Sequence, residues 1–147
     1  MFGIGELSRT TGCPIETIRY YEKSNLLHPP PRTNGGHRLY NENHQKRLQF
    51  ILKARGLGFS VDKTRELLSL SESNERPCSE ALVLVEDNLA LVNEKLMELH
   101  VIKNSLISMA ANCKSGCSGA QAPDCTIVDS LFTKPLPSVT DTKGCAC

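Results

Sequence analysis

The chain has 147 residues, enough for one domain or for a small module with an appendage. Its apolar fraction of 39% supports a modest core and argues against general disorder. The start of the chain lacks a signal-peptide pattern, and no apolar run reaches the length of a membrane span. We therefore expect a cytoplasmic protein without a membrane partner.

The net charge of +1 hides an uneven distribution. Residues 1–70 contain eleven Lys and Arg against six Asp and Glu, whereas residues 71–147 contain six against ten. A basic front half with an acidic rear half indicates a nucleic-acid-binding module with a second element attached.

The beginning of the chain has the pattern of two short helices joined by a tight turn. The first helix is predicted at residues 4–10 and the second at 14–23. The sequence Gly12-Cys13-Pro14 separates them, and proline suits the first turn of the following helix. This arrangement is typical of a helix-turn-helix.

The next segment predicts a hairpin and two more helices. Prolines make residues 26–31 an extended connection. Asn34-Gly35 then predicts a hairpin turn, so that residues 34–40 form a wing. Helices are expected at 43–55 and 61–70, with Ser60 as the N-cap of the latter. These elements together predict a mainly helical, winged helix-turn-helix domain.

The rear half predicts one long helix, because residues 79–112 contain neither Pro nor Gly. Its apolar residues recur every three or four positions, which is the pattern of a coiled-coil seam. The alternative is a helix packed on its own domain, but the chain has no second helix of this length. We therefore expect a homodimer. The predicted seam consists of Leu82, Val85, Leu89, Val92, Leu96, Leu99 and, after an interruption at Lys103, Leu106.

Cysteines flank this predicted helix at both ends. Cys78 and Cys113 are 35 residues apart, so an intervening helix holds them roughly 50 Å apart. If two helices pair antiparallel, Cys78 of the partner lies beside Cys113. The loop that follows brings Cys125, and Cys117 with less certainty, to the same place. Clustered thiolates select soft or borderline ions such as Zn, Cd, Pb, Hg or Cu(I).

The other cysteines have different expected roles, and two alternatives to metal sensing stay open. Cys13 is expected to pack as a small apolar side chain, and the metal-binding role of Cys145 and Cys147 is left open. One alternative is a thiol redox regulator on the same scaffold, using Cys113 and Cys117. A second is a metal buffer or zinc enzyme. The sequence shows no nucleophile–base pattern, so we expect no catalysis.

The basic half offers candidate DNA contacts. Side chains of the second helix can enter the major groove, where Arg reads guanine through two hydrogen bonds. Basic and aromatic residues around it can contact phosphates. The groove candidates are Thr17, Arg19 and Tyr20, and the phosphate candidates are Lys23, Arg38, Tyr40, Arg47 and Lys53.

Over residues 2–132 the chain resembles the MerR family of bacterial metal-responsive transcription regulators. The resemblance is carried by IGEL at 4–7, ETIRYYE at 16–22, RTNGGHRLY at 32–40, RLQFI at 47–51, LGFS at 57–60 and RELL at 65–68. The cysteines at 78, 113 and 125 are similar to those of the branch that senses divalent soft metals. Sensors of Cu(I) have Ser at the first position, so Cys78 favours Zn, Cd, Pb or Hg.

The resemblance implies a mechanism and a domain organisation. Such homodimers bind a palindrome in double-stranded promoter DNA with an overlong spacer, repress without metal, and activate RNA polymerase by distorting the DNA when metal binds. Deformation of DNA costs energy that a protein–effector complex can supply. The expected parts are a DNA-binding domain at 1–70, a linker and antiparallel dimerisation helix at 71–112, a metal-binding loop with a short helix at 113–132, and a mobile tail at 133–147.

Overall fold

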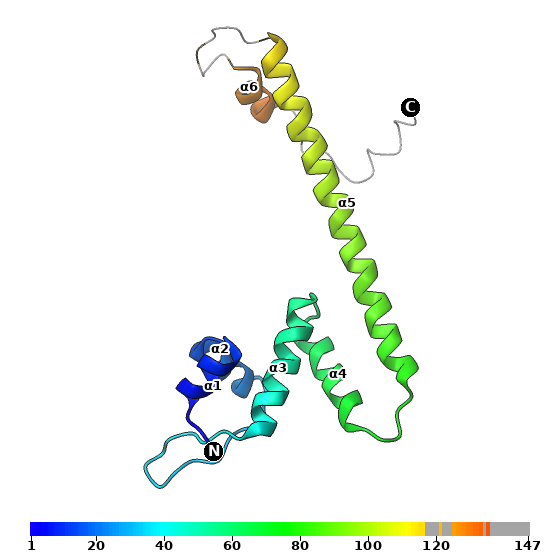
Figure 1. The fold of residues 1–147 in the computed structure, drawn as a ribbon. Coiled ribbons are helices and arrows are strands. Elements are labelled where there is room, and N and C mark those ends of the chain that lie inside the picture. Colours follow the sequence, from blue (N-terminus) through cyan, green and yellow to red (C-terminus); the bar gives the residue numbers. More distant parts are fainter. Residues whose placement is uncertain (117–120, 122–124, 134, 136–147) are drawn as a thin grey trace. The chain divides into compact units, whose positions relative to one another are not determined.

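The computed structural model describes residues 1–116, 121, 125–133 and 135. Among them it contains helices and no regular strand, which confirms the mainly helical prediction. Each helix ends within about one turn of its predicted position (Figure 1). The helices are α1 (Ile4–Thr11), α2 (Ile15–Lys23), α3 (Glu42–Gly56), α4 (Val61–Glu72), α5 (Cys78–Gly116) and α6 (Thr126–Thr133).

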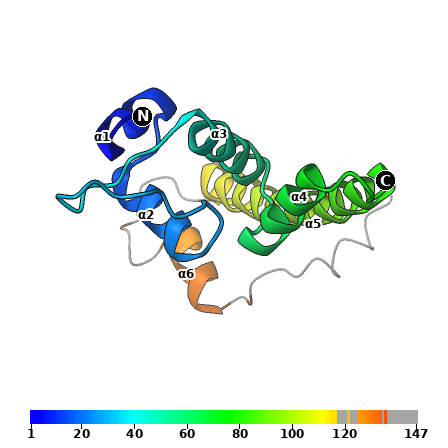
Figure 2. The same cartoon turned by 90° about the horizontal axis from the view of Figure 1, so that it is seen from below.

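The chain divides into two compact units, residues 1–88 and 89–147, and the division falls within α5. In the first unit α1 packs against α2 and α3, and α3 packs against α4 (Figure 2). The core of this unit includes Leu7, Ile18, Leu26, Leu27, Tyr40, Leu48 and Ile51, all 0% exposed. Burial of each aliphatic side chain contributes about 1.5–3 kcal/mol, so this core holds the short helices together.

Local signals determine where α2 and α3 end. After α2, Asn25 adopts a left-handed φ of 55°, and the Leu26 N–H donates to the Tyr21 carbonyl oxygen at 2.9 Å. After α3, Gly58 adopts a φ of 87°, and the Phe59 N–H donates to the Ala54 carbonyl oxygen at 3.2 Å. Both arrangements satisfy carbonyl groups that the helix itself leaves unpaired.

The predicted helix starts at α3 and α4 are also supported by caps. The Ser60 hydroxyl accepts a hydrogen bond from the Lys63 N–H at 3.1 Å, which confirms its predicted role. At α3 the Asn41 side chain accepts from the His44 N–H at 3.1 Å, and the His44 ring accepts from the Asn41 N–H. This reciprocal pair is a capping box.

The hairpin begins at Arg32, which pairs with Arg38, two residues before its predicted start. We call residues 32–40 the wing, and it projects from the helices in both overall views (Figures 1 and 2). The Thr33 N–H donates to the His37 carbonyl oxygen at 2.8 Å, and the Gly36 N–H donates to the Thr33 carbonyl oxygen at 2.8 Å. Gly36 takes the left-handed conformation, with a φ of 80°, whereas neither residue of the predicted Asn34-Gly35 turn does. The wing is therefore a three-residue hairpin loop with a glycine at its last position.

Helix α5 is the longest element, with 39 residues. In the first unit its residues Leu84 and Asn88 are buried, and Leu84 joins a small core with Ala54 and Phe59. The predicted seam residues of α5 are exposed in the single chain, by between 42% at Val92 and 61% at Leu99. Neither α5 nor any other described helix is apolar enough to span a membrane.

Candidate DNA-binding surface and metal-binding cysteines

Helix α2 presents an exposed face of polar and aromatic side chains. Ile18 and Tyr21 are buried, whereas Arg19 and Tyr20 are exposed, Tyr20 by 52%. Thr17 is half-buried on the same helix. Because buried and exposed residues alternate with the helical period, α2 is anchored by one side and offers the other to a ligand.

The last turn of α2 is joined to the wing by side chains. The Arg38 Nε donates to the Glu22 Oε2 at 2.9 Å, and the Tyr40 hydroxyl donates to the Glu22 Oε1. Tyr40 is 0% exposed, and burial, followed by the hydrogen bond and charge of Glu22, raises the pKa of its phenol well above the usual range. Tyr40, which the sequence suggested as a phosphate contact, thus has its ring in the core and its hydroxyl on Glu22.

Arg47, another phosphate candidate from the sequence, also has partners inside the first unit. Its Nε donates to the Leu26 carbonyl oxygen at 2.7 Å, its Nη1 pairs with Glu72, and its side chain is only 13% exposed. A second arginine, Arg65, donates from Nη2 to the Ser24 carbonyl oxygen at 2.8 Å. Arg65 thus bonds the C-cap residue of α2, where a cation complements the partial negative charge of the helix end. Arg47 bonds the connection that follows α2.

Two other phosphate candidates from the sequence are surface lysines. Lys23 at the end of α2 and Lys53 in α3 are exposed. No hydrogen bond or ion pair joins the side-chain ammonium group of either lysine to the part of the chain that the structure describes.

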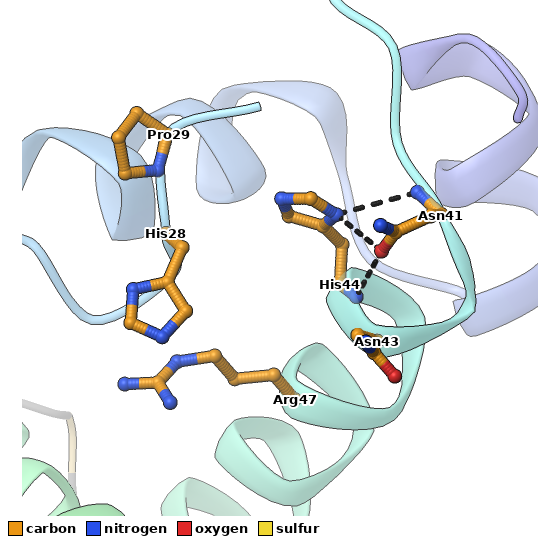
Figure 3. Close-up of a pocket in the computed structure, with 6 residues that line it drawn as sticks. All are labelled: His28, Pro29, Asn41, Asn43, His44 and Arg47. Atoms are coloured by element: carbon orange, nitrogen blue, oxygen red, sulfur yellow. Dashed lines mark hydrogen bonds between the residues drawn. The ribbon is translucent and has the colours of Figure 1, made fainter. Parts of the chain in front are cut away.

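A pocket that the sequence did not reveal lies between the α2–α3 connection and the start of α3 (Figure 3). Burial lowers the pKa of His44, and the charge of His28 lowers it further, against a smaller opposite effect of Glu22. The pocket is lined by His28, Pro29, Asn41, Asn43, His44 and Arg47.

The cysteines that the structure describes fall into two groups. Cys13 is buried in the core, and burial raises the pKa of its thiol, which agrees with a packing role. Cys78 is exposed at the first residue of α5, whereas Cys113 near the end of α5 and Cys125 before α6 are half-buried. The predicted or open ligands Cys117, Cys145 and Cys147 lie outside the described residues.

The donor set fits a soft metal ion, because it consists of thiols that retain some exposure to solvent. Within one chain, however, the described His, Cys, Asp and Glu side chains form no group of three that could hold a metal ion. Cys78 and Cys113 stand at opposite ends of α5.

Residues 2–71 match the profile of the MerR HTH family of regulatory proteins, and residues 45–109 match a profile described as "MerR, DNA binding". The HTH-type transcriptional regulator ZntR of Escherichia coli strain K12 is 38% identical over 133 residues, covering 89% of this chain and 92% of ZntR. The chain belongs to the MerR family. MerR-type regulators control transcription through a helix-turn-helix.

Solved structures of MerR proteins have the same fold. PbrR691 of Ralstonia metallidurans CH34, in complex with lead(II), superposes with a TM-score of 0.76 at 35% identity, covering 89% of this chain and 99% of PbrR691. MerR of Bacillus megaterium MB1, in complex with mercury(II), superposes with a TM-score of 0.63 at 28% identity, covering 89% of this chain and 99% of that MerR. The present chain thus spans nearly the whole length of these MerR proteins.

Proposed function

We propose that this MerR protein is a homodimeric transcriptional regulator that responds to a divalent soft metal ion. The observation that carries the proposal is the placement of the cysteines around α5. Cys78 begins the helix and Cys113 lies near its end, while the apolar seam between them is exposed. Antiparallel pairing of two such helices covers the seams and brings Cys78 of one chain to Cys113 and Cys125 of the other.

The relatives support a metal effector. PbrR691 and the MerR protein of Bacillus megaterium were solved with lead(II) and mercury(II), and both share most of their length with this chain. Thiolate ligands favour Zn, Cd, Pb or Hg over hard ions such as Mg. We propose Cys78, Cys113 and Cys125 as ligands, and Cys117 as a fourth. A bound ion would link the cysteine thiolates at the start of one α5 to those at the end of the other.

The first unit is proposed to bind a palindrome in promoter DNA. Thr17, Arg19 and Tyr20 of α2 read the major groove. Lys23 and Lys53 contact phosphates, with Arg38 of the wing. We propose that the metal-free dimer represses a promoter whose spacer is overlong. When metal binds, the first unit of each chain distorts this DNA so that RNA polymerase engages both promoter elements.

The test is transcription in vitro from the promoter region upstream of the gene, with purified RNA polymerase and strictly reduced protein. The reaction is titrated with Zn, Cd, Pb, Hg, Co and Cu(I). We expect transcription to rise with at least one of the ions Zn, Cd, Pb or Hg and not with an oxidant. A response only to oxidant would favour the thiol redox alternative, and no binding to promoter DNA would favour a metal buffer.

A further inference from the structure

We propose that Glu22 is a positioning residue that aims Arg38 of the wing at a DNA phosphate and fixes the wing to α2. This inference rests on the proposed DNA-binding function. Glu22 lies in the last turn of α2, where the charge of a carboxylate by itself repels phosphate. In the structure its side chain is only 10% exposed, and both carboxylate oxygens accept hydrogen bonds from the wing.

The geometry of Arg38 leaves its outer nitrogens available. A guanidinium has five N–H donors, and Arg38 uses Nε for Glu22 at 2.9 Å. Its Nη1 and Nη2 make no hydrogen bond to the described part of the chain, and the side chain is 32% exposed. An arginine held at Nε presents its two terminal nitrogens together, which is the geometry that binds phosphate through two hydrogen bonds.

Glu22 is itself fixed by the core. The Tyr40 hydroxyl donates to Oε1 of Glu22, and the Tyr40 ring is fully buried. The backbone of Tyr40 is paired in both directions with Phe2, with N–O distances of 2.9 Å. The chain of contacts thus runs from the segment before α1, through Tyr40 and Glu22, to Arg38. Because Tyr40 is fully buried and the Glu22 side chain is only 10% exposed, these contacts hold the wing and α2 together as one surface.

Positioning and simple electrostatics predict opposite results when the charge of Glu22 is removed. Glu22→Gln adds one unit of net positive charge to the DNA-binding unit, so electrostatics alone predicts tighter DNA binding. If Glu22 positions Arg38, the same substitution weakens binding, because an amide offers one acceptor for two donors and no charge to hold the guanidinium. The sign of the change therefore separates the two explanations.

The experiment measures the affinity of the full-length protein for a duplex selected by the unaltered protein from a random-sequence pool. Fluorescence anisotropy gives Kd over a range of salt concentrations. We expect Glu22→Gln to weaken binding roughly tenfold and to lower the salt slope by about one phosphate contact. The matched control is Glu16→Gln, which removes an exposed carboxylate from the first turn of the same helix. It is expected to bind DNA as well as the unaltered protein or more tightly.

A double-mutant cycle distinguishes positioning from loss of folding. Glu22→Gln is repeated in an Arg38→Gln background, where we expect it to cause little further loss of affinity. Equal losses in both backgrounds, or binding by Glu22→Gln as tight as that of Glu16→Gln, would overturn the inference and leave the proposed function standing. Failure of the unaltered protein to select any duplex would overturn both.

Discussion

The side-chain amide of Asn88 in α5 donates a hydrogen bond to the carbonyl oxygen of Leu57, at the turn between α3 and α4, over 2.9 Å. Asn88 is 6% exposed, and its neighbour Asp87 forms an ion pair with Lys63 of α4 at 3.6 Å. Leu84, one turn earlier, is buried against Ala54 and Phe59 of the same corner. The start of α5 is therefore attached to α3 and α4 of the first unit by apolar, hydrogen-bonded and charged contacts.

We expect Asn88→Ala to lower the free energy of unfolding by about 1–2 kcal/mol, because it leaves the Leu57 carbonyl without this donor in a mostly buried place. Urea denaturation of the full-length protein at fixed concentration measures the change. Asn93→Ala, at an exposed position of the same helix, is the control and is expected to leave stability unchanged. Equal stability of the two variants would show that the Asn88 hydrogen bond contributes nothing measurable.

The seam of α5 gives a test of the dimer. Leu96 and Met97 are equally exposed in one chain, at 50% and 52%, but only Leu96 lies on the seam. We expect Leu96→Asp to weaken dimerisation about 100-fold or more, since a buried leucine contributes about 1.5–3 kcal/mol and the substitution occurs in both chains. Sedimentation equilibrium measures the dissociation constant. Met97→Asp is expected to remain dimeric, and loss of the dimer in both variants alike would argue against this seam.

Mixed dimers test whether each metal site uses both chains. Cys78→Ser and Cys113→Ser each remove a proposed ligand from both sites of their own homodimer. A heterodimer of the two variants keeps one complete site if Cys78 of one chain pairs with Cys113 of the other. We expect it to bind about half the Cd(II) of the unaltered dimer, as measured by thiolate-to-metal absorbance. The Cys13→Ser homodimer is the control and is expected to bind fully. A heterodimer without Cd(II) would contradict the shared site.

Acid sensitivity is expected from His44. Burial lowers its pKa in the folded protein, and the charge of His28 adds to this. The unfolded chain, with an ordinary histidine pKa near 6.5, therefore binds a proton more readily. Stability is fully present above that value and falls as pH decreases through it towards the folded pKa.

His44→Gln tests this dependence, because glutamine at this position supports the same capping box but does not titrate. We expect its thermal unfolding midpoint to fall less than that of the unaltered protein between pH 7.5 and pH 5.5. His100→Gln, at an exposed position in α5, is expected to keep the dependence of the unaltered protein. If His44→Gln loses as much stability in acid as His100→Gln does, His44 is not the source.

The sequence alone determined the helices and their ends, because the signals that define them are local. Ser60 caps α4 through a residue three positions later, and Asn25 and Gly58 end helices through bonds within a single turn. The period of apolar residues also predicted the seam of α5, whose residues are exposed in the single chain. The identification of Cys13 as a packing residue also followed from its place in the helix-turn-helix.

The tertiary structure decided which polar residues face each other. Tyr40 and Glu22 are 18 residues apart, Arg47 and Leu26 are 21, and Asn88 and Leu57 are 31. The periodicity within one element does not predict such pairs. The sequence therefore suggested Tyr40 and Arg47 as surface contacts, whereas in the folded chain their donor groups bind partners inside the first unit. The proposed cysteine site depends on quaternary structure as well, since its proposed ligands meet only when a second chain binds.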